Sequence, residues 1–143
     1  MIKYVKGNLL EATEPYIGHG CNAQGVMGSG VALAIKTKWP KAFDDYRREF
    51  DETGLELGSI INSPQPDGKI ILNCITQNYY GRNALRYASY DAIDDCMVGL
   101  RNFGYDNIAF PKIGAGLGGG SWEVIEAIIN HRLIDRNVTI YCL

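Results

Sequence analysis

The stretch Gly18-His19-Gly20-Cys21-Asn22-Ala23-Gln24-Gly25-Val26-Met27-Gly28-Ser29-Gly30-Val31-Ala32 decides the fold of this chain. It leaves a short apolar strand, crosses a loop that contains Gly25, Gly28 and Gly30, and enters an apolar helix. Glycine allows a ligand to approach the backbone closely, and the unpaired N–H groups at the start of a helix attract anions. The stretch therefore predicts a phosphate-binding loop, although tight turns use the same residues.

A second glycine-rich stretch, residues 114–120, follows the strand predicted at 107–110 and precedes a helix that Ser121 can cap. Gly114, Gly116 and Gly119 fit the Gly-x-Gly-x-x-Gly pattern of dinucleotide-binding folds. However, only one helix and one strand follow, and no acidic residue ends that strand. A nicotinamide-dependent dehydrogenase is therefore not expected.

Both glycine loops come after a strand and before a helix. Ligands of open α/β sheets bind beyond the carboxyl ends of the strands, so the two loops are expected to hold one ligand from both sides. A nucleotide with a diphosphate fits this arrangement. Because few Lys or Arg residues stand beside the loops, backbone dipoles must supply most of the attraction.

Strands and helices alternate along the chain, which predicts an α/β sheet covered on both faces. The expected strands are residues 2–5, 16–21, 59–62, 69–76, 107–110 and 138–143, and the expected helices are 29–38, 41–51, 89–103 and 121–131.

The composition of the 143 residues, 46% hydrophobic and 21% charged, is that of one globular domain. No apolar run is long enough to span a membrane and no signal peptide opens the chain, so a cytoplasmic protein is expected. The formal net charge of −2 argues against a large basic surface for duplex nucleic acid.

The four cysteines are widely spaced and only two histidines accompany them, so neither a metal site nor a cofactor is predicted. Cys21 is more typical of a small buried hydrophobic residue than of a nucleophile.

Several motifs together resemble the macrodomain family of ADP-ribose-binding modules. They are Tyr4-Val5-Lys6-Gly7-Asn8-Leu9, His19-Gly20-Cys21-Asn22, Gly28-Ser29-Gly30-Val31-Ala32, Ile75-Thr76-Gln77, Pro111-Lys112-Ile113-Gly114-Ala115-Gly116-Leu117 and Thr139-Ile140-Tyr141-Cys142-Leu143. The resemblance covers residues 1–143 as a single macrodomain and implies a three-layer α/β/α fold with a central mixed sheet. It is strongest with the small branch of ADP-ribose 1″-phosphate phosphatases and terminal ADP-ribose protein glycohydrolases, many of which are phage or bacterial proteins.

This resemblance implies that adenine lies near Asn8 and Leu9, with Leu143 at the edge of the pocket. Asn8 replaces the usual aspartate, so it accepts from adenine without the help of a charge. The diphosphate is expected between residues 28–31 and residues 114–118. The full set of implied ligand contacts is Asn8, Leu9, Asn22, Gly28, Ser29, Gly30, Val31, Thr76, Lys112, Ile113, Gly114, Ala115, Gly116, Leu117, Gly118 and Leu143.

Asn22 and His19 are the predicted catalytic residues. Asn22 matches the position that hydrogen-bonds the distal ribose, and the alternative is an Asx turn that ends the strand. His19 would act as general acid or base at the ribose 1″ position, since an ordinary imidazole pKa of about 6.5 suits proton transfer. The alternative for His19 is a core residue with its hydrogen bonds satisfied.

Two residues of the glycohydrolase pattern are missing. A lysine is expected near Gln77 and Asn78, and an aspartate at Gly118, which places a covalent lysine mechanism in doubt. Tyr79-Tyr80-Gly81-Arg82 could cover the distal ribose, and the alternative is a solvated loop whose aromatic side chains are partly packed. The leading hypothesis is an enzyme that hydrolyses a group at the distal ribose, most directly a 1″-phosphate. The alternatives are a non-catalytic reader or scavenger of ADP-ribose, and a glycohydrolase that acts on modified protein or nucleic acid.

Overall fold

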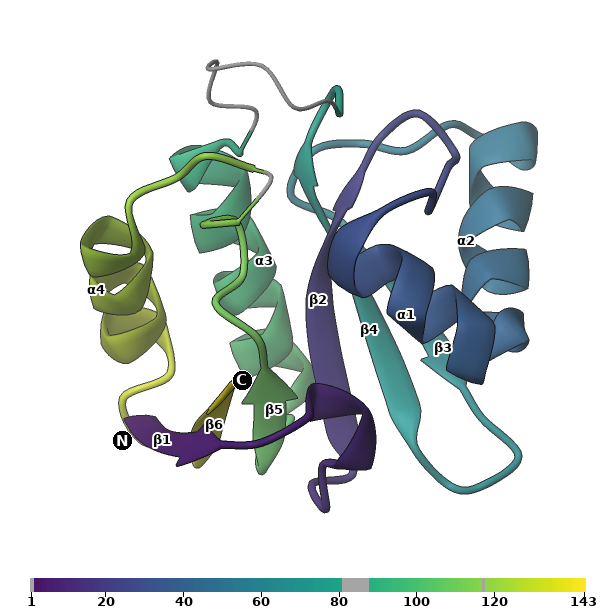
Figure 1. The fold of residues 1–143 in the computed structure, drawn as a ribbon. Coiled ribbons are helices and arrows are strands. Elements are labelled where there is room, and N and C mark those ends of the chain that lie inside the picture. The colour runs from purple at the N-terminus through teal and green to yellow at the C-terminus, as the bar shows by residue number, and fades with distance from the viewer. Residues whose placement is uncertain (1, 81–87, 117) are drawn as a thin grey trace.

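The computed structural model describes residues 2–80, 88–116 and 118–143. These residues form six strands, with helices around them, arranged as in Figure 1. The strands are β1 (Ile2–Lys6), β2 (Tyr16–Asn22), β3 (Ile60–Pro64), β4 (Ile70–Gln77), β5 (Ile108–Phe110) and β6 (Val138–Cys142). The helices are the short 3₁₀ helix η1 (Leu9–Glu11) and α1 (Gly30–Lys38), α2 (Pro40–Glu52), α3 (Tyr90–Phe103) and α4 (Trp122–Arg132).

The strands form one sheet in the order β1-β6-β5-β2-β4-β3. Every neighbouring pair is parallel except β3 and β4, which are antiparallel, so the predicted mixed sheet is confirmed. The carboxyl ends of the five parallel strands therefore lie along one edge of the sheet. Strand β3 is longer than the expected residues 59–62 and includes Pro64, which an edge strand tolerates.

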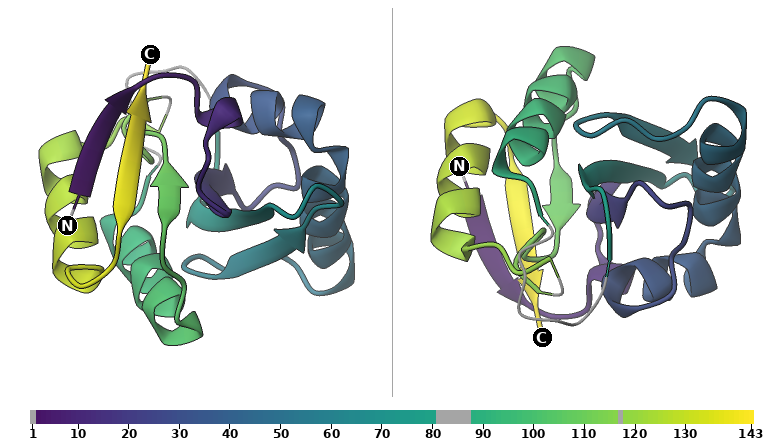
Figure 2. Two further views of the ribbon diagram at one scale, coloured as in Figure 1. Left: turned by 90° about the horizontal axis from the view of Figure 1, so that it is seen from below. Right: turned by 90° about the horizontal axis from the view of Figure 1, so that it is seen from above.

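Alternate residues of the strands face two separate layers of helices. Ile17 and Ile71 pack with residues of α1 and α2, whereas Leu72, Phe110 and Ile140 pack with residues of α3 and α4. In both views of Figure 2, α1 and α2 lie together on one side and α3 and α4 on the other. This arrangement confirms the predicted three-layer α/β/α fold.

The helix starts follow local sequence signals. The Ser89 hydroxyl accepts a hydrogen bond from Ala92 N (3.1 Å) and caps α3, as predicted. Pro40 occupies the first turn of α2, where its missing N–H costs nothing. Ser29 and Ser121 stand at the N-cap positions of α1 and α4 but make no side-chain cap hydrogen bond. None of the helices in the described part of the chain is long and apolar enough to cross a bilayer.

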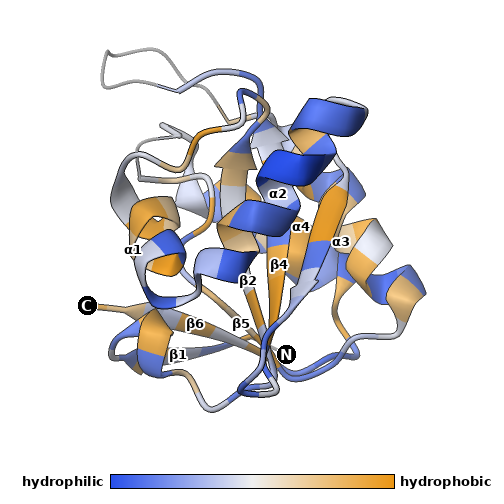
Figure 3. Ribbon diagram, turned by 90° about the vertical axis from the view of Figure 1, so that its right-hand side faces the viewer, coloured by the Kyte–Doolittle hydropathy of each residue, from blue (hydrophilic) through white to orange (hydrophobic). Residues whose placement is uncertain are grey.

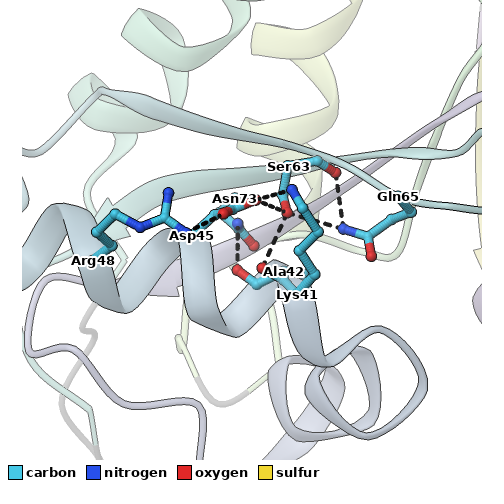
Figure 4. Close-up of polar contacts among 7 residues, drawn as sticks. All are labelled: Lys41, Ala42, Asp45, Arg48, Ser63, Gln65 and Asn73. Carbon is cyan, nitrogen blue, oxygen red and sulfur yellow. Dashed lines mark hydrogen bonds and ion pairs between the residues drawn. The ribbon is translucent and has the colours of Figure 1, made fainter.

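A polar cluster attaches α2 to the sheet (Figure 4). The Asp45 carboxylate accepts from Lys41 Nζ (2.8 Å), from Arg48 (2.9 Å) and from the Ser63 hydroxyl of β3 (2.5 Å). Burial by itself would raise the pKa of Asp45, but the hydrogen bonds from Lys41 and Ser63 outweigh it and lower that pKa. The outer face of α2 is hydrophilic, as Figure 3 shows, so the helix has a clear inner and outer side.

Candidate ligand-binding site

A cavity of about 540 Å³ lies at the carboxyl ends of β2, β4 and β5. Its walls come from the ends of these strands, from the start of α1 and from the loop after β5. The lining residues are Gly20, Cys21, Asn22, Ser29, Gly30, Val31, Ala32, Thr76, Gln77, Tyr80, Pro111, Lys112, Ile113, Gly114, Ala115, Gly116 and Gly118. The two glycine loops, which are far apart in the sequence, therefore contribute to one cavity.

Both loops present backbone N–H groups for which the described part of the chain provides no partner. Because Ser29 does not cap α1, no hydrogen bond within the described residues uses the N–H groups of Val31 and Ala32. The same holds for the N–H groups of Gly114 and Gly116 in the second loop. The positive end of the α1 dipole adds to this attraction, so the cavity is suited to an anion.

The fold requires some glycines of the second loop but not all of them. Gly114 has a φ of +77°, which other residues rarely adopt. A Cβ on Gly118 would lie 2.7 Å from the carbonyl oxygen of Gly114, so packing excludes a side chain there. Gly116 has no positive φ, and an added Cβ would have no atom within 4 Å. Neither backbone nor packing requires glycine at 116, where it leaves the cavity open.

The Asn22 side chain closes an Asx turn and also lines the cavity. Its Oδ1 accepts from Gln24 N (2.9 Å), and its Nδ2 donates to the carbonyl oxygen of Val26 (3.0 Å). The Tyr46 hydroxyl lies 2.9 Å from the same Oδ1 and 2.7 Å from the main-chain oxygen of Asn22. The local turn and the ligand contact, which the sequence presented as alternatives, are thus compatible in one geometry.

His19 does not reach the cavity. Its side chain is fully buried on the same face of β2 as Ile17 and Cys21, and its Nε2 lies 2.6 Å from Asn73 Oδ1, to which it donates. Burial lowers the pKa of His19 to about 4, although the hydrogen bond to Asn73 works in the opposite direction. The structure therefore corrects the expectation that His19 and Asn22 meet at one ribose: strand alternation directs His19 into the core, where a polar partner satisfies it.

Thr76 is a fully buried residue at the base of the cavity, on strand β4. Its Oγ1 has no hydrogen-bond partner within the described residues. The register of β2 and β4 shifts between Cys21 and Asn22, so Thr76 falls where the ladder is irregular. An unpaired buried hydroxyl is costly, about 1–3 kcal/mol, and this cost is relieved when a ligand supplies the partner.

Burial also raises the pKa of the Cys21 thiol, which keeps it protonated.

Gln77 lines the cavity at the position where the resemblance places a lysine. Its Nε2 donates to the carbonyl oxygen of Tyr79 (2.6 Å). Tyr80 contributes to the same wall and is more than half exposed. Lys112 is the cation among the described lining residues, and its side chain is exposed.

The residues predicted for adenine lie outside this lining. Asn8 is exposed and its Oδ1 accepts from Leu10 N (3.0 Å), so it caps η1. Leu9 is buried, and Leu143 is almost fully exposed just after β6. Strands β1 and β6 are parallel and pair Lys6 with Cys142 at their carboxyl ends, which brings the segment after β1 and the C-terminal Leu143 to the same edge of the sheet as the cavity. The adenine contacts therefore remain a prediction.

Gly28 is exposed and does not line the cavity, whereas Leu117, Gly81 and Arg82 lie outside the described residues. Gly20 and Pro111, which line the cavity, and Tyr46 are not among the ligand contacts predicted from the sequence. Strand alternation could have found Gly20, because residues 20 and 22 of one strand share a face. No local signal identifies Tyr46, because it lies on a different element.

Comparison with known proteins gives a consistent result. The model of the family described as Macro domain matches residues 19–129. An uncharacterized 17.5 kDa protein of Enterobacteria phage T4 is 36% identical over 141 residues, which cover 91% of this chain and 88% of that protein. The DNA ADP-ribosyl glycohydrolase of Mycobacterium tuberculosis is 32% identical over 130 residues, 88% of this chain but only 37% of that protein. The ADP-ribose 1″-phosphate phosphatase of Candida albicans is 27% identical, with 90% of this chain and 92% of that protein covered.

Solved structures agree with the sequence comparison. A protein of unknown function from Bacteroides thetaiotaomicron superposes with a TM-score of 0.88 at 30% identity, covering 100% of this chain and 98% of the other. The macrodomain of Mycobacterium tuberculosis DarG superposes with a TM-score of 0.81 at 30% identity, with 100% and 98% of the two chains covered.

Proposed function

Because this chain belongs to the macrodomain family, we propose that it binds ADP-ribose or a derivative of it in the cavity at the carboxyl ends of β2, β4 and β5. The diphosphate lies between the start of α1 and residues 114–116, and the distal ribose lies toward Asn22. The adenine lies toward Asn8, Leu9 and Leu143.

One observation carries this proposal: two sets of backbone N–H groups that no described residue uses, from α1 and from the second glycine loop, line the same cavity. A diphosphate carries the negative charge and the several acceptor oxygens that such donors require. The open space above Gly116 gives the ligand access to this backbone.

The proposed reaction is hydrolysis at the distal ribose, with ADP-ribose 1″-phosphate as the substrate. Water attacks the phosphorus atom, the bond between phosphorus and the ribose oxygen breaks, and that oxygen takes a proton released by the attacking water, which yields ADP-ribose and inorganic phosphate. Asn22 orients the ribose and Lys112 offsets the charge of the phosphate. The relatives named as ADP-ribose 1″-phosphate phosphatases, which match this chain over most of both lengths, support this choice. His19 takes no part in the reaction, because it is buried outside the cavity.

A second candidate is a reader that binds ADP-ribose without turnover. It is favoured by one observation: the described lining residues include no carboxylate and no imidazole that could act as a general base.

Removal of ADP-ribose from DNA or protein is a third candidate, supported by the 32% identical mycobacterial relative. It is weakened by Gln77 and Gly118, which stand where a lysine and an aspartate are expected, because an amide cannot act as an amine nucleophile.

The test combines binding and turnover. ADP-ribose affinity is measured by calorimetry, and the protein is then incubated with ADP-ribose 1″-phosphate, with an ADP-ribosylated oligonucleotide and with an ADP-ribosylated protein. We expect binding and phosphate release from the first substrate, and both should be lost in Gly116→Val. Absence of ADP-ribose binding would overturn the proposal altogether. Binding without any turnover would establish the reader, and release of ADP-ribose from either macromolecule would establish the glycohydrolase.

A further inference from the structure

We propose that Tyr46, a residue of α2 outside the cavity lining, positions Asn22 so that its side chain can act toward the ligand only as a hydrogen-bond donor. This inference rests on the proposed function, because it concerns how the same site recognises the distal ribose. Tyr46 is fully buried and lies two dozen residues further along the chain than Asn22.

The first step is that two protein donors, the backbone N–H of Gln24 and the Tyr46 hydroxyl, lie against Asn22 Oδ1. This oxygen accepts from the backbone N–H of Gln24 at 2.9 Å and lies 2.9 Å from the Tyr46 hydroxyl. The hydroxyl is also 2.7 Å from the main-chain oxygen of Asn22 and 3.4 Å from that of Val26. All three of these oxygens are acceptors, so the Tyr46 hydroxyl directs its single proton toward them, while backbone hydrogen bonds from Gly25 and Val26 act to lower its pKa.

The second step is the orientation of the Asn22 amide. Nδ2 donates to the carbonyl oxygen of Val26 at 3.0 Å. A flipped amide would place Oδ1 against that carbonyl and Nδ2 against the N–H of Gln24, so both contacts would become repulsive. The backbone of the loop and Tyr46 therefore select one orientation.

The third step concerns the second N–H group of Asn22 Nδ2. An amide nitrogen has two N–H groups, and within the described residues one of those on Nδ2 has a partner. Because Asn22 lines the cavity, the remaining N–H is available to a ligand. The ligand atom that it contacts must be an acceptor, such as a hydroxyl or phosphoryl oxygen at the distal ribose.

The ring of Tyr46 and its hydroxyl have separable roles. The ring packs with Cys21, Met27 and Ile75 in the core beneath the loop, whereas the hydroxyl reaches the Asn22–Val26 segment. Burial raises the pKa of Tyr46, so its hydroxyl remains a protonated donor throughout the working range. Replacement by phenylalanine should therefore remove the positioning contact and keep the packing.

The experiment compares Tyr46→Phe with Tyr105→Phe. Tyr105 is a suitable control because its partly buried hydroxyl also donates to an asparagine oxygen, Asn62 Oδ1 at 3.2 Å, away from the cavity lining. Affinities are measured for ADP-ribose and for ADP, which has the diphosphate but no distal ribose. We expect Tyr46→Phe to weaken ADP-ribose binding about tenfold, as the loss of one buried hydrogen bond implies, and to leave ADP binding within about twofold. Tyr105→Phe should change neither affinity.

Equal weakening of both ligands, or no weakening of ADP-ribose, would overturn the role of Tyr46. A ligand-free measurement separates this result from failure of the proposed function. The side-chain amide of Asn22 is followed by NMR, and its protons should exchange faster in Tyr46→Phe than in wild type. Unchanged exchange would refute the positioning contact even if the protein did not bind ADP-ribose.

Discussion

Gly116→Val separates ligand binding from folding more sharply than any other substitution in the cavity. The backbone at Gly116 does not need a positive φ, and a Cβ built there would have no neighbour within 4 Å. We therefore expect the free energy of unfolding to change by less than about 0.5 kcal/mol, as for surface positions. The valine side chain would instead occupy the space in which the diphosphate approaches the backbone.

The loss of affinity follows from the donors that the ligand can no longer reach. The N–H groups of Gly114 and Gly116 have no partner within the described residues, and hydrogen bonds to a charged group contribute about 1.5–3 kcal/mol each. Loss of both amounts to about 3–6 kcal/mol, and each 1.4 kcal/mol is tenfold in affinity, so binding should weaken at least about a hundredfold.

Calorimetry with ADP-ribose and urea denaturation of the same samples measure the two quantities. Gly99→Ala is the control, because Gly99 lies within α3 and an added Cβ would approach only the terminal carbon of Ile60, at 3.2 Å. Gly118→Ala should behave differently and lose stability as well, since its Cβ would lie 2.7 Å from the Gly114 carbonyl oxygen. A folded Gly116→Val protein that bound ADP-ribose within about threefold of wild type would refute the placement of the diphosphate.

Three further predictions concern stability. The folded-state pKa of His19, about 4, lies below its ordinary value of 6.5. The stability that neutral His19 contributes is therefore complete above pH 6.5, and the free energy of unfolding falls by about 3 kcal/mol as the pH is lowered to 4. Urea denaturation at both pH values should show a smaller fall for His19→Gln, whose ADP-ribose affinity at pH 7 should stay within about twofold of wild type. Asp45→Asn should lower the free energy of unfolding by about 2 kcal/mol in the same assay, because it weakens three charge-assisted hydrogen bonds. The control Asp51→Asn, at an exposed ion pair, should change the free energy of unfolding by less than about 0.5 kcal/mol. Gly18→Ala should cost about 1–3 kcal/mol, measured as a lower Tm, since its Cβ would lie 2.8 Å from Phe110 Cδ1 in the core; an unchanged Tm would contradict this packing.

The order of strands and helices and the two glycine loops could be predicted from the sequence. Pro40 separates α1 from α2, and Ser89 caps α3, because each acts on the backbone within one turn of its own position. The glycines likewise mark turns through their own conformational freedom. Such signals are local, so they can be recognised in the sequence without knowledge of the fold. That the two glycine loops lie close together follows from the rule that parallel strands end at one edge of the sheet.

The tertiary structure alone decided what the individual side chains of the site do. His19 is a core residue because Asn73, on the neighbouring strand, supplies an acceptor on the buried face of the sheet. We infer that Asn22 is a donor toward the cavity because the hydroxyl of Tyr46, on a helix packed behind it, lies 2.9 Å from its side-chain oxygen. Both outcomes depend on partners that are distant in the chain and on the face of the sheet to which each side chain points. Sequence spacing does not encode such partners, since they are brought together only when the strands pair and the helices pack.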